Sequence, residues 1–566
     1  MASEIRLIRV WPSVSSRKRM ENNTNPCPTN AVLKIEQFTV QLPQGADRDF
    51  AIEDITLQIT PREILCVVGE SGSGKSVTAH GVMGLLPTSQ LKPVNGSIHL
   101  QGESLLNASP SRLQKLRGSR MAMIFQEPMT ALNPVMTLGR QIEEVFAQHT
   151  KEAARVRKSR TLDLMGSVNL PDPQGLYSSF PHQISGGQRQ RIMIAMALAL
   201  EPALLIADEP TTALDVTTQA QILKLISSIQ REHDTGVLFI THDFGVVAEI
   251  ADRVAVMKNG RIVETGKMED VLRNPKDPYT KMLIRAVPSF SPRRRGSTGK
   301  KPVVLRVENL SKIYHTKTLL GRRRKVVAAQ NVTIRVQQGE TLGVVGESGS
   351  GKSTLARCVT RLIEPSDGQI FMGDEEIGKL PLRRFRHWRK RVQIIFQDPY
   401  RSLNPRRTIG EAIAEGPINF GLSYQEAYRR ANELLSLVGI DPSAANRFPH
   451  QFSGGQRQRA CIARALAMEP ELLIADEPVS ALDVSVQAQV LNLLTDLQSR
   501  FNLAILFITH DLRVAAQVCD QIAVMYRGQI VEQGPVLQVF SAPAHQYTKR
   551  LFEAAPGRSW DFSNFS

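Results

Sequence analysis

Two stretches of the chain combine residue types and spacing that suit phosphate binding. The sequence GESGSGKS occurs at 69–76 and again at 346–353, and both copies fit the pattern G-x-x-x-x-G-K-[ST]. Glycines in such a loop let backbone N–H groups wrap phosphates, and a helix N-terminus after the loop adds about half a positive charge. In the first copy, Lys75 is placed to reach the β- and γ-phosphates of a nucleotide, and Ser76 to bind Mg²⁺.

Both copies of this phosphate-binding loop (P-loop) stand in the context that the motif requires. In the first copy, the apolar run Ile64–Val68 predicts a buried strand before the loop, and Ser76–Leu85 predicts a helix after it. A single match could be a flexible Gly/Ser turn, but two matches after two strands argue against that interpretation. The residues predicted to hold the nucleotide in these loops are Gly69, Glu70, Ser71, Gly72, Ser73, Gly74, Lys75, Ser76 and Val77, and Gly346, Glu347, Ser348, Gly349, Ser350, Gly351, Lys352, Ser353 and Thr354.

A pair of acidic residues ends a buried-strand pattern in each half of the chain. Asp208 and Glu209 follow the run Leu204–Ala207, and Asp476 and Glu477 repeat the arrangement. We expect each Asp to hold Mg²⁺ through water and each Glu to polarise the attacking water as a general base. A strand-end cap without chemistry is the alternative, and the P-loop upstream makes it the weaker interpretation.

Histidine and glutamine side chains lie at the ends of other predicted strands. His242 follows the run Val237–Ile240, and His510 matches it in the second half. A lone histidine is more often structural, but a place at the carboxyl edge of a parallel sheet, where ligands bind, favours contact with the γ-phosphate. Gln126 and Gln397 end the runs MAMIF and VQIIF and could reach Mg²⁺ and the attacking water. The predicted magnesium ligands are Ser76, Gln126 and Asp208, and Ser353, Gln397 and Asp476.

The elements that position these residues are repeated. IFQEP returns as IFQDP, and SGGQRQR, LLIADEP and FITHD each occur twice, in the same order and at a nearly constant offset. A repeat this long indicates two whole domains, since solenoid units span only about 20–50 residues. The join SFSPRRRGSTGKK has a linker composition. The predicted organisation is a flexible tail at 1–29, a first domain at 30–288, a linker at 289–302, a second domain at 303–556 and a C-terminal tail at 557–566.

Each half alternates short apolar runs with helical patterns such as Thr218–Glu232. This alternation favours a mostly parallel sheet with helices on its faces. The stretch Thr137–Leu170 has a mostly helical pattern and predicts a helical subdomain inserted between IFQEP and SGGQ. The predicted fold class is α/β, with two tandem P-loop NTPase domains, each a mixed and mostly parallel sheet with a helical subdomain.

The P-loop, the glutamine loop, SGGQ, the strand ending in Asp-Glu, SALD or TALD, and the loop histidine occur in an order and spacing that resemble the ABC ATPase family. The SGGQ signature separates that family from other P-loop NTPases. The resemblance implies that two cassettes sandwich two ATP molecules head to tail. It also implies which signature serves which site: Ser185, Gly186, Gly187 and Gln188 contact the ATP held by Lys352, and Ser453, Gly454, Gly455 and Gln456 contact the ATP held by Lys75.

The same resemblance implies a power stroke, in which ATP closes the sandwich and hydrolysis reopens it. Because both halves keep the full set of residues, we predict two hydrolysing sites. There are departures from the family pattern. The residue before SGGQ, usually Leu, is Ile184 and Phe452. The aromatic residue that stacks on adenine resembles Tyr314 in the second half, whereas the matching first-half position is Leu42, which offers only apolar contact.

Four longer motifs resemble the branch that imports dipeptides, oligopeptides or nickel, including fused glutathione importers. They are FQEPMTALNP, FQDPYRSLNP and the two endings NPKDPYTKMLIRAVP and APAHQYTKRLFEAAP. The second ending has His545-Gln546-Tyr547 where His-Pro-Tyr is typical. The resemblance implies two separate permease subunits and a periplasmic solute-binding protein, with this chain as a peripheral motor on the cytoplasmic face of the inner membrane. Those partners would set the solute.

Composition limits the other classes. The formal charge is +16, and much of the excess lies in clusters such as 17–19, 293–295 and 322–325. We interpret these clusters as solvated linkers or tails, or as contacts to lipid headgroups beside a permease, and we predict no nucleic-acid partner. The longest apolar stretches fall short of the roughly 18–20 residues that span a bilayer. The five cysteines are scattered without CxxC spacing, which argues against zinc or iron–sulfur sites and fits a reducing cytosol.

Two alternatives stay open. One is the motor of a transporter for a non-peptide solute such as nickel or opines, or of an exporter, because the ATP chemistry would be the same. The other is a soluble twin-cassette translation factor. Proteins of that kind usually join their cassettes by a long charged helix, whereas the join at 289–301 is short and broken by Pro and Gly.

Overall fold

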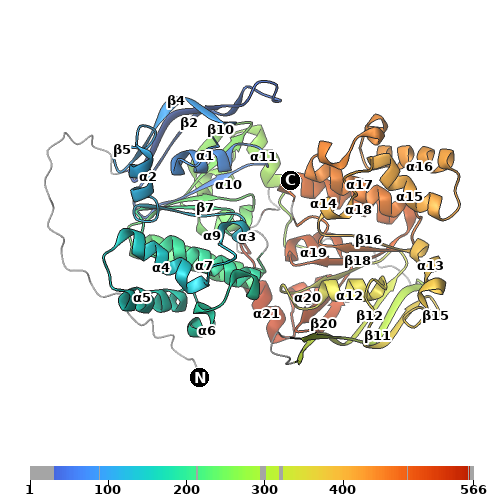
Figure 1. Cartoon of the computed structure of the whole chain (residues 1–566). Coiled ribbons are helices and arrows are strands. Elements are labelled where there is room, and N and C mark those ends of the chain that lie inside the picture. The colour runs from blue at the N-terminus through green and yellow to red at the C-terminus, as the bar shows by residue number, and fades with distance from the viewer. Residues whose placement is uncertain are drawn as a thin grey trace, which may run out of the picture. The chain divides into compact units, whose positions relative to one another are not determined.

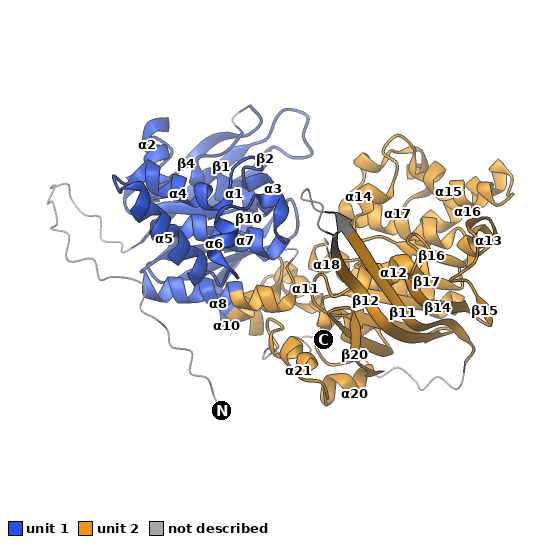
Figure 2. Ribbon diagram, turned by 60° about the horizontal axis from the view of Figure 1, so that its bottom comes forward, with its two compact units in different colours: residues 1–212, 222–241, 250–268 blue, residues 213–221, 242–249, 269–566 orange. Residues whose placement is uncertain are grey.

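The structure is a computed structural model of the chain, and it describes residues 31–87, 89–211, 214–292, 301–317, 323–480, 482–558, 560 and 562. The predicted tail at 1–29 and most of the predicted linker lie outside the described residues. The contacts divide the chain into two compact units (Figure 2). Unit 1 comprises 1–212, 222–241 and 250–268; unit 2 comprises 213–221, 242–249 and 269–566. The predicted domain boundaries stay predictions.

Unit 1 contains the parallel sheet that the apolar runs predict. Its strands lie in the order β10-β9-β3-β8-β7-β6, and every pair is parallel except β9 with β10. The central strands consist entirely of buried residues, as expected where helices cover both faces. The strands are β3 (Ile64–Val68), β6 (Met121–Ile124), β7 (Leu204–Asp208), β8 (Gly236–Ile240), β9 (Arg253–Lys258) and β10 (Arg261–Lys267).

A second sheet in unit 1 is antiparallel and was not predicted from the sequence. Its order is β2-β1-β4-β5, and its apolar side shares one core with helix α1 (Lys75–Met83) and the parallel sheet. Register shifts within β1 break the strict alternation of apolar and polar residues that would have revealed it. The strands are β1 (Leu33–Gln41), β2 (Phe50–Ile59), β4 (Lys92–Leu100) and β5 (Glu103–Ser104).

The predicted helical subdomain of the first half is confirmed as a group of helices that pack on one another, α4 to α7 (Figure 1). The helices that lie wholly in unit 1, besides α1, are α2 (Pro110–Leu116), α3 (Pro128–Ala131), α4 (Leu138–His149), α5 (Ala154–Ser167), α6 (Pro173–Tyr177), η1 (Pro181–Gln183) and α7 (Gly186–Leu198). Further along the chain follow α8 (Val216–Glu232), α9 (Phe244–Ile250), α10 (Met268–Arg273) and α11 (Pro278–Arg285).

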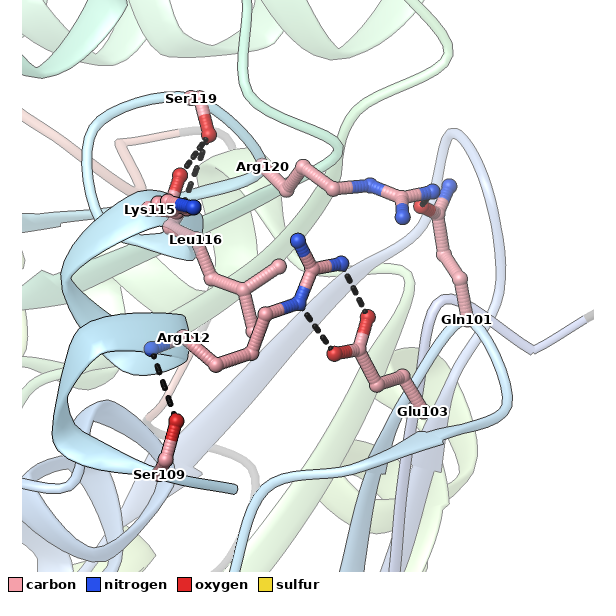
Figure 3. A network of polar contacts seen from close by, with 8 residues as sticks. All are labelled: Gln101, Glu103, Ser109, Arg112, Lys115, Leu116, Ser119 and Arg120. Carbon is pink, nitrogen blue, oxygen red and sulfur yellow. Dashed lines mark hydrogen bonds and ion pairs between the residues drawn. The ribbon is translucent and has the colours of Figure 1, made fainter. Parts of the chain in front are cut away.

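A polar network fixes α2 to the edge of the antiparallel sheet (Figure 3). The Ser109 hydroxyl caps the helix by accepting the N–H of Arg112. The Arg112 guanidinium in turn forms two hydrogen bonds to the Glu103 carboxylate of β5, with distances of 2.6 and 2.8 Å. This two-point pairing lowers the pKa of Glu103. It orients the helix that leads into β6, the strand before Gln126.

Unit 2 repeats both sheets. The mostly parallel sheet has the order β16-β17-β18-β13-β19-β20, and the antiparallel sheet has the order β12-β11-β14-β15. The strands of the first are β13 (Thr341–Val345), β16 (Val392–Ile395), β17 (Leu472–Asp476), β18 (Ala504–Thr509), β19 (Gln521–Tyr526) and β20 (Gln529–Pro535). Those of the second are β11 (Val303–Lys317), β12 (Arg323–Gln337), β14 (Asp367–Met372) and β15 (Glu375–Glu376).

Unit 2 contains α11 and, from the second half of the chain, helices that follow the order of the first half. They are α12 (Lys352–Val359), α13 (Leu382–Arg391), α14 (Pro399–Ser402), α15 (Ile409–Asn419), α16 (Tyr424–Leu437), η2 (Pro442–Asn446), η3 (Pro449–Gln451), α17 (Gly454–Leu466), α18 (Val484–Phe501), α19 (Leu512–Val518), α20 (Val536–Ser541) and α21 (Gln546–Glu553). Within the described residues, no helix is long and apolar enough to span a bilayer.

Candidate functional site

Each P-loop lies between a buried parallel strand and a helix, as the sequence predicts. The loop at 69–74 joins β3 to α1, and the loop at 346–351 joins β13 to α12. The last glycine of each loop has a positive φ, 105° at Gly74 and 111° at Gly351. A Cβ at Gly351 would also overlap the carbonyl oxygen of Ala328. Glycine is therefore required for the turn that points the helix N-terminus into the loop.

The lysine of each P-loop forms hydrogen bonds to carbonyl oxygens at the start of the same loop. The Lys75 ammonium donates to the carbonyl oxygens of Gly69 at 2.7 Å and Glu70 at 2.8 Å. Lys352 donates to the carbonyls of Gly346 and Glu347 at 2.8 and 2.9 Å. Burial lowers the pKa of Lys352, and the charges of Glu477 and Asp476 oppose this effect. A buried cation held by carbonyls is positioned to bind an anionic ligand.

The structure brings each P-loop serine together with the aspartate that was predicted to share its magnesium ion. The Ser76 hydroxyl donates to Asp208 at the end of β7, at 3.2 Å, and the Ser353 hydroxyl donates to Asp476 at the end of β17, at 3.1 Å. Desolvation raises the pKa of both carboxyls, against the opposing effect of the serine hydrogen bonds. The ionised form of each carboxylate is therefore disfavoured by burial, and a bound cation would stabilise it.

The glutamine and glutamate predicted to handle the attacking water contact each other in both halves. The Gln126 amide donates to the Glu209 carboxylate at 2.8 Å, and the Gln397 amide donates to Glu477 at the same distance. Both glutamates have a positive φ, 47° for Glu209 and 48° for Glu477. Left-handed backbone at a non-glycine residue costs about 1–3 kcal/mol and is concentrated at functional sites.

His510 pairs with the proposed general base of the second half. Its Nδ1 lies 3.3 Å from the Glu477 carboxylate. Burial disfavours the imidazolium, but the hydrogen bond and charge of Glu477 outweigh burial and raise the pKa of His510. Conversely, burial would raise the pKa of Glu477, and His510 together with Lys352 lowers it. His242 occupies the equivalent chain position, two residues after the end of β8.

The SGGQ segments begin helices. Ser185 is the N-cap of α7, with its hydroxyl accepting the Gln188 N–H at 3.3 Å while the Gln188 side chain accepts the Ser185 N–H at 3.0 Å. Ser453 and Gln456 form the same capping box on α17. Both serines are exposed, and Ile184 and Phe452 before them are buried. The S-x-x-Q spacing is the signal in the sequence for this cap, which was missed as a helix start.

The residues at the predicted adenine position differ as the sequence indicates. Tyr314 lies in β11, partly exposed, and the Lys312 ammonium is 5.3 Å from its ring centroid. Leu42 lies directly after β1 and packs partly against the core of unit 1. The second half thus has an aromatic ring at this position of its first long strand, and the first half has an aliphatic side chain there.

One contact to a P-loop was missed from the sequence. The Thr217 hydroxyl donates to the Glu347 carboxylate at 2.6 Å, and both residues belong to unit 2. The same hydroxyl oxygen also lies 2.8 Å from the Asp215 carboxylate, so its single proton can be donated to only one of the two carboxylates at a time. The Asp two residues before Thr217 was a signal for a local hydroxyl–carboxylate turn, but no spacing rule links Thr217 to residue 347.

A phosphate-binding loop with a buried aspartate beside its serine, and with a glutamate held by a glutamine nearby, is the arrangement of P-loop nucleoside triphosphatases, and here it is built twice. The chain belongs to the ABC transporter family. The family described as "ABC transporter" matches residues 52–212 and 329–480. The family described as "Oligopeptide/dipeptide transporter, C-terminal region" matches 263–317 and 531–559.

Relatives are similar over nearly the whole chain. The "Peptidoglycan transport ATP-binding protein YejF" of Agrobacterium fabrum is 45% identical, covering 94% of this chain and 97% of that protein. The "Glutathione import ATP-binding protein GsiA" is 47% identical in Shigella boydii and 46% in Escherichia coli K12, each covering 93% of this chain and 89% of that protein. The predictions of twin ABC ATPase domains and of ATP hydrolysis are therefore confirmed.

Proposed function

We propose that this ATPase is the motor of an importer for peptides or a peptide-like solute such as glutathione. The observation that carries the proposal is the oligopeptide/dipeptide C-terminal region, which is matched once after each cassette. The names of the similar proteins, which refer to peptidoglycan transport and glutathione import, point the same way. In this proposal the chain binds to two permease subunits at the cytoplasmic face of the inner membrane, and a periplasmic protein supplies the solute.

In this proposal each residue of the two sites has a role. Lys75 and Lys352 bind the β- and γ-phosphates, and the N–H groups of the two loops wrap them. Glu209 and Glu477 accept a proton from the attacking water, which Gln126 and Gln397 help to place through their hydrogen bonds to these carboxylates. His242 and His510 contact the γ-phosphate in this proposal.

The residues beside each P-loop serine fit Mg²⁺. A serine hydroxyl, a buried aspartate and a glutamine amide oxygen are hard oxygen donors, which Mg²⁺ prefers. Within the described part of the chain, no cluster of three or more His, Cys, Asp or Glu residues could form an all-protein metal cage, and Mg²⁺ in ATPases is held mainly by one carboxylate, water and phosphate oxygens. When bound, the ion neutralises charge on the transferred phosphoryl group.

The two SGGQ helices are proposed to complete the ATP sites in trans. Ser185–Gln188 would contact the ATP on Lys352, and Ser453–Gln456 the ATP on Lys75. Support comes from the exposed, capped N-termini of α7 and α17, which present N–H groups and serine hydroxyls suited to an anion. Fusion of the halves would keep each signature at an effective concentration of about mM for its site.

The test is to identify what the chain binds. The tagged chain is purified from detergent-solubilised membranes, and the accompanying proteins are identified by mass spectrometry. Two multi-span permeases are expected, together with a solute-binding protein encoded with them. Titration of that binding protein with di- and tripeptides, glutathione and Ni²⁺ then separates the peptide proposal from the nickel alternative. Recovery only from the soluble fraction, with ribosomal proteins, would contradict the transporter assignment.

A further inference from the structure

A tyrosine of the C-terminal region reaches the second P-loop. The Tyr547 hydroxyl, on α21, accepts the backbone N–H of Glu347 at 3.2 Å. The two residues are far apart in sequence, and Tyr547 belongs to the segment 531–559, outside the cassette match at 329–480. The side chain is only 3% exposed, so the hydroxyl is presented to the loop from within the packed structure.

The C-terminal region is built to hold this tyrosine in place. The Tyr547 ring stacks on Tyr526 of β19, with centroids 4.1 Å apart. The imidazole of His545 caps α21 by accepting the Tyr547 N–H at 3.1 Å. The Glu532 carboxylate of β20 accepts the N–H groups of Ala544 and His545 at 2.7 and 3.0 Å, which fixes the turn before the helix. Strand, turn and helix therefore all define the position of one hydroxyl group.

This geometry explains why Gln546 is tolerated where proline is typical. Gln546 is the first residue of α21, and Pro278 is the first residue of α11 in the first half. Proline suits that position because a backbone N–H at the first residue of a helix has no acceptor within the helix, so nothing is lost when proline lacks it. Glutamine can also begin a helix, and here the His545 cap keeps the turn intact. The departure from His-Pro-Tyr therefore leaves the tyrosine in place.

The other polar groups of Glu347 already have partners. Its carbonyl oxygen accepts Lys352, the lysine that closes the loop, at 2.9 Å. Its carboxylate accepts Thr217 at 2.6 Å. The bond from Tyr547 thus satisfies the one remaining group, the backbone N–H, and defines the orientation of the peptide plane before Glu347. The carbonyl oxygen of that peptide belongs to Gly346 and is the second oxygen to which Lys352 donates.

We propose that Tyr547 is a positioning residue of the second ATP site: its hydroxyl fixes the Gly346–Glu347 peptide and, through it, Lys352. The C-terminal region is in this view a part of the ATP site rather than an appendage to the cassette. Binding groups must be held within about 0.5 Å of the productive geometry to be effective, so loss of the hydroxyl weakens ATP binding. This inference rests on the proposed role of the second P-loop in binding ATP.

The test measures equilibrium binding of a fluorescent ATP analogue to the full chain. All variants carry Lys75→Ala, which disables the first site and leaves the second as the reporter. Tyr547→Phe keeps the ring and its stacking and removes only the acceptor. We expect the Kd for the analogue to rise about fivefold or more, because without its acceptor the Gly346–Glu347 peptide is no longer held in the orientation that positions Lys352, and restoring one hydrogen-bonded arrangement on ATP binding costs about 1 kcal/mol. The matched control, Tyr526→Phe, removes a hydroxyl from the partner ring of the same stack and should leave the Kd unchanged.

A second pair of variants separates positioning from packing. Glu347→Pro removes the N–H itself, and residue 347 is not among those with positive φ that would exclude proline. With Glu347→Ala as the reference for the lost carboxylate, Tyr547→Phe should weaken binding in the Ala chain and add nothing in the Pro chain. An equal effect of Tyr547→Phe in both chains would overturn the proposed contact. Thermal unfolding of every variant identifies any that do not fold.

A Lys352→Ala variant distinguishes a wrong P-loop assignment from a wrong role of Tyr547. If Lys352→Ala in the Lys75→Ala chain leaves binding intact, the P-loop assignment is wrong. If Lys352→Ala abolishes binding but Tyr547→Phe matches Tyr526→Phe, the P-loop assignment stands and the role given to Tyr547 is wrong.

Discussion

The two P-loop sites of this chain share the same polar contacts but differ in some of the residues around them. The hydrogen bonds from lysine to loop carbonyls, from serine to aspartate and from glutamine to glutamate occur in both halves, with distances that differ by about 0.1 Å. By contrast, Tyr314 in the second half corresponds to Leu42 in the first. The chemistry depends on short local segments that both halves keep, while the surroundings have diverged.

A second difference lies beside the loop histidines. His510-Asp511-Leu512-Arg513 corresponds to His242-Asp243-Phe244-Gly245. Within unit 2, the Arg513 guanidinium is 3.4 Å from the Asp243 carboxylate, donates to the Pro556 carbonyl and lies over the rings of Phe290 and Phe562.

A Cβ at Gly245 would overlap this guanidinium. Glycine in one half therefore makes room for arginine in the other, an asymmetry that a duplicated chain can acquire and a homodimer cannot. We therefore expect equal chemistry at the two sites and unequal effects of the residues around them.

The largest effect is expected from removing the general bases. Glu209→Gln and Glu477→Gln should each reduce steady-state ATP turnover by about 10²-fold or more, since proton transfer contributes about 10²–10⁴-fold. The glutamine side chain keeps the volume and a hydrogen-bond partner for Gln126 or Gln397. Binding of ATP should persist in both variants, as shown by nucleotide titration. A single variant with normal turnover would refute the prediction of two equivalent hydrolysing sites.

The exchange of the adenine-side residues should give a smaller effect, in opposite directions. Tyr314→Leu is expected to weaken ATP binding at the second site by about fivefold to tenfold, because stacking on a base contributes about 1–3 kcal/mol. Leu42→Tyr should strengthen binding at the first site. Lys75→Ala and Lys352→Ala backgrounds isolate each site for titration with ATP. No change from either exchange would mean that residues 42 and 314 do not face the adenine.

A shift in pH dependence should follow from removing His510. The hydrogen bond and charge of this histidine lower the pKa of Glu477 against the effect of burial, so His510→Ala should move the pKa of Glu477 upward. The residual ATPase rate should then begin to fall at a higher pH on the acid side than it does in the unchanged chain. His242→Ala provides the matched measurement for the first half. A profile whose acid limb does not move would show that Glu477 does not determine that limb.

These comparisons also show what the sequence could predict. Short contiguous motifs gave the P-loops, the Asp-Glu strand ends and the parallel strands before them, because each is fixed by local geometry that spacing reveals. The antiparallel sheets escaped prediction because register shifts in β1 and β11 hide the alternation of buried residues. The contact of Tyr547 with Glu347 escaped as well, since it depends on how a C-terminal helix packs on a loop 200 residues away.

The smallest expected effect concerns stability and should be equal in both halves. Desolvation raises the pKa of Asp208 and Asp476, so each ionised carboxylate destabilises the protein without Mg²⁺ at neutral pH. Asp208→Asn and Asp476→Asn keep an oxygen to accept the serine hydroxyl and remove the charge. Each should raise the Tm by a few degrees at pH 7, since 1 kcal/mol corresponds to about 2–4 °C in domains of this size.

The sign of the pH dependence provides the control. A raised carboxyl pKa in the folded state means that the penalty is complete above that pKa and disappears as pH falls toward the unfolded value. The gain from each Asn should therefore shrink as the Tm is measured at increasingly acidic pH. The exposed Asp374→Asn should show no gain at any pH. With MgATP present the order should reverse, because the unchanged chain binds the nucleotide more tightly and is stabilised by it. A gain that persists in acid would assign the effect to packing rather than to the buried charge.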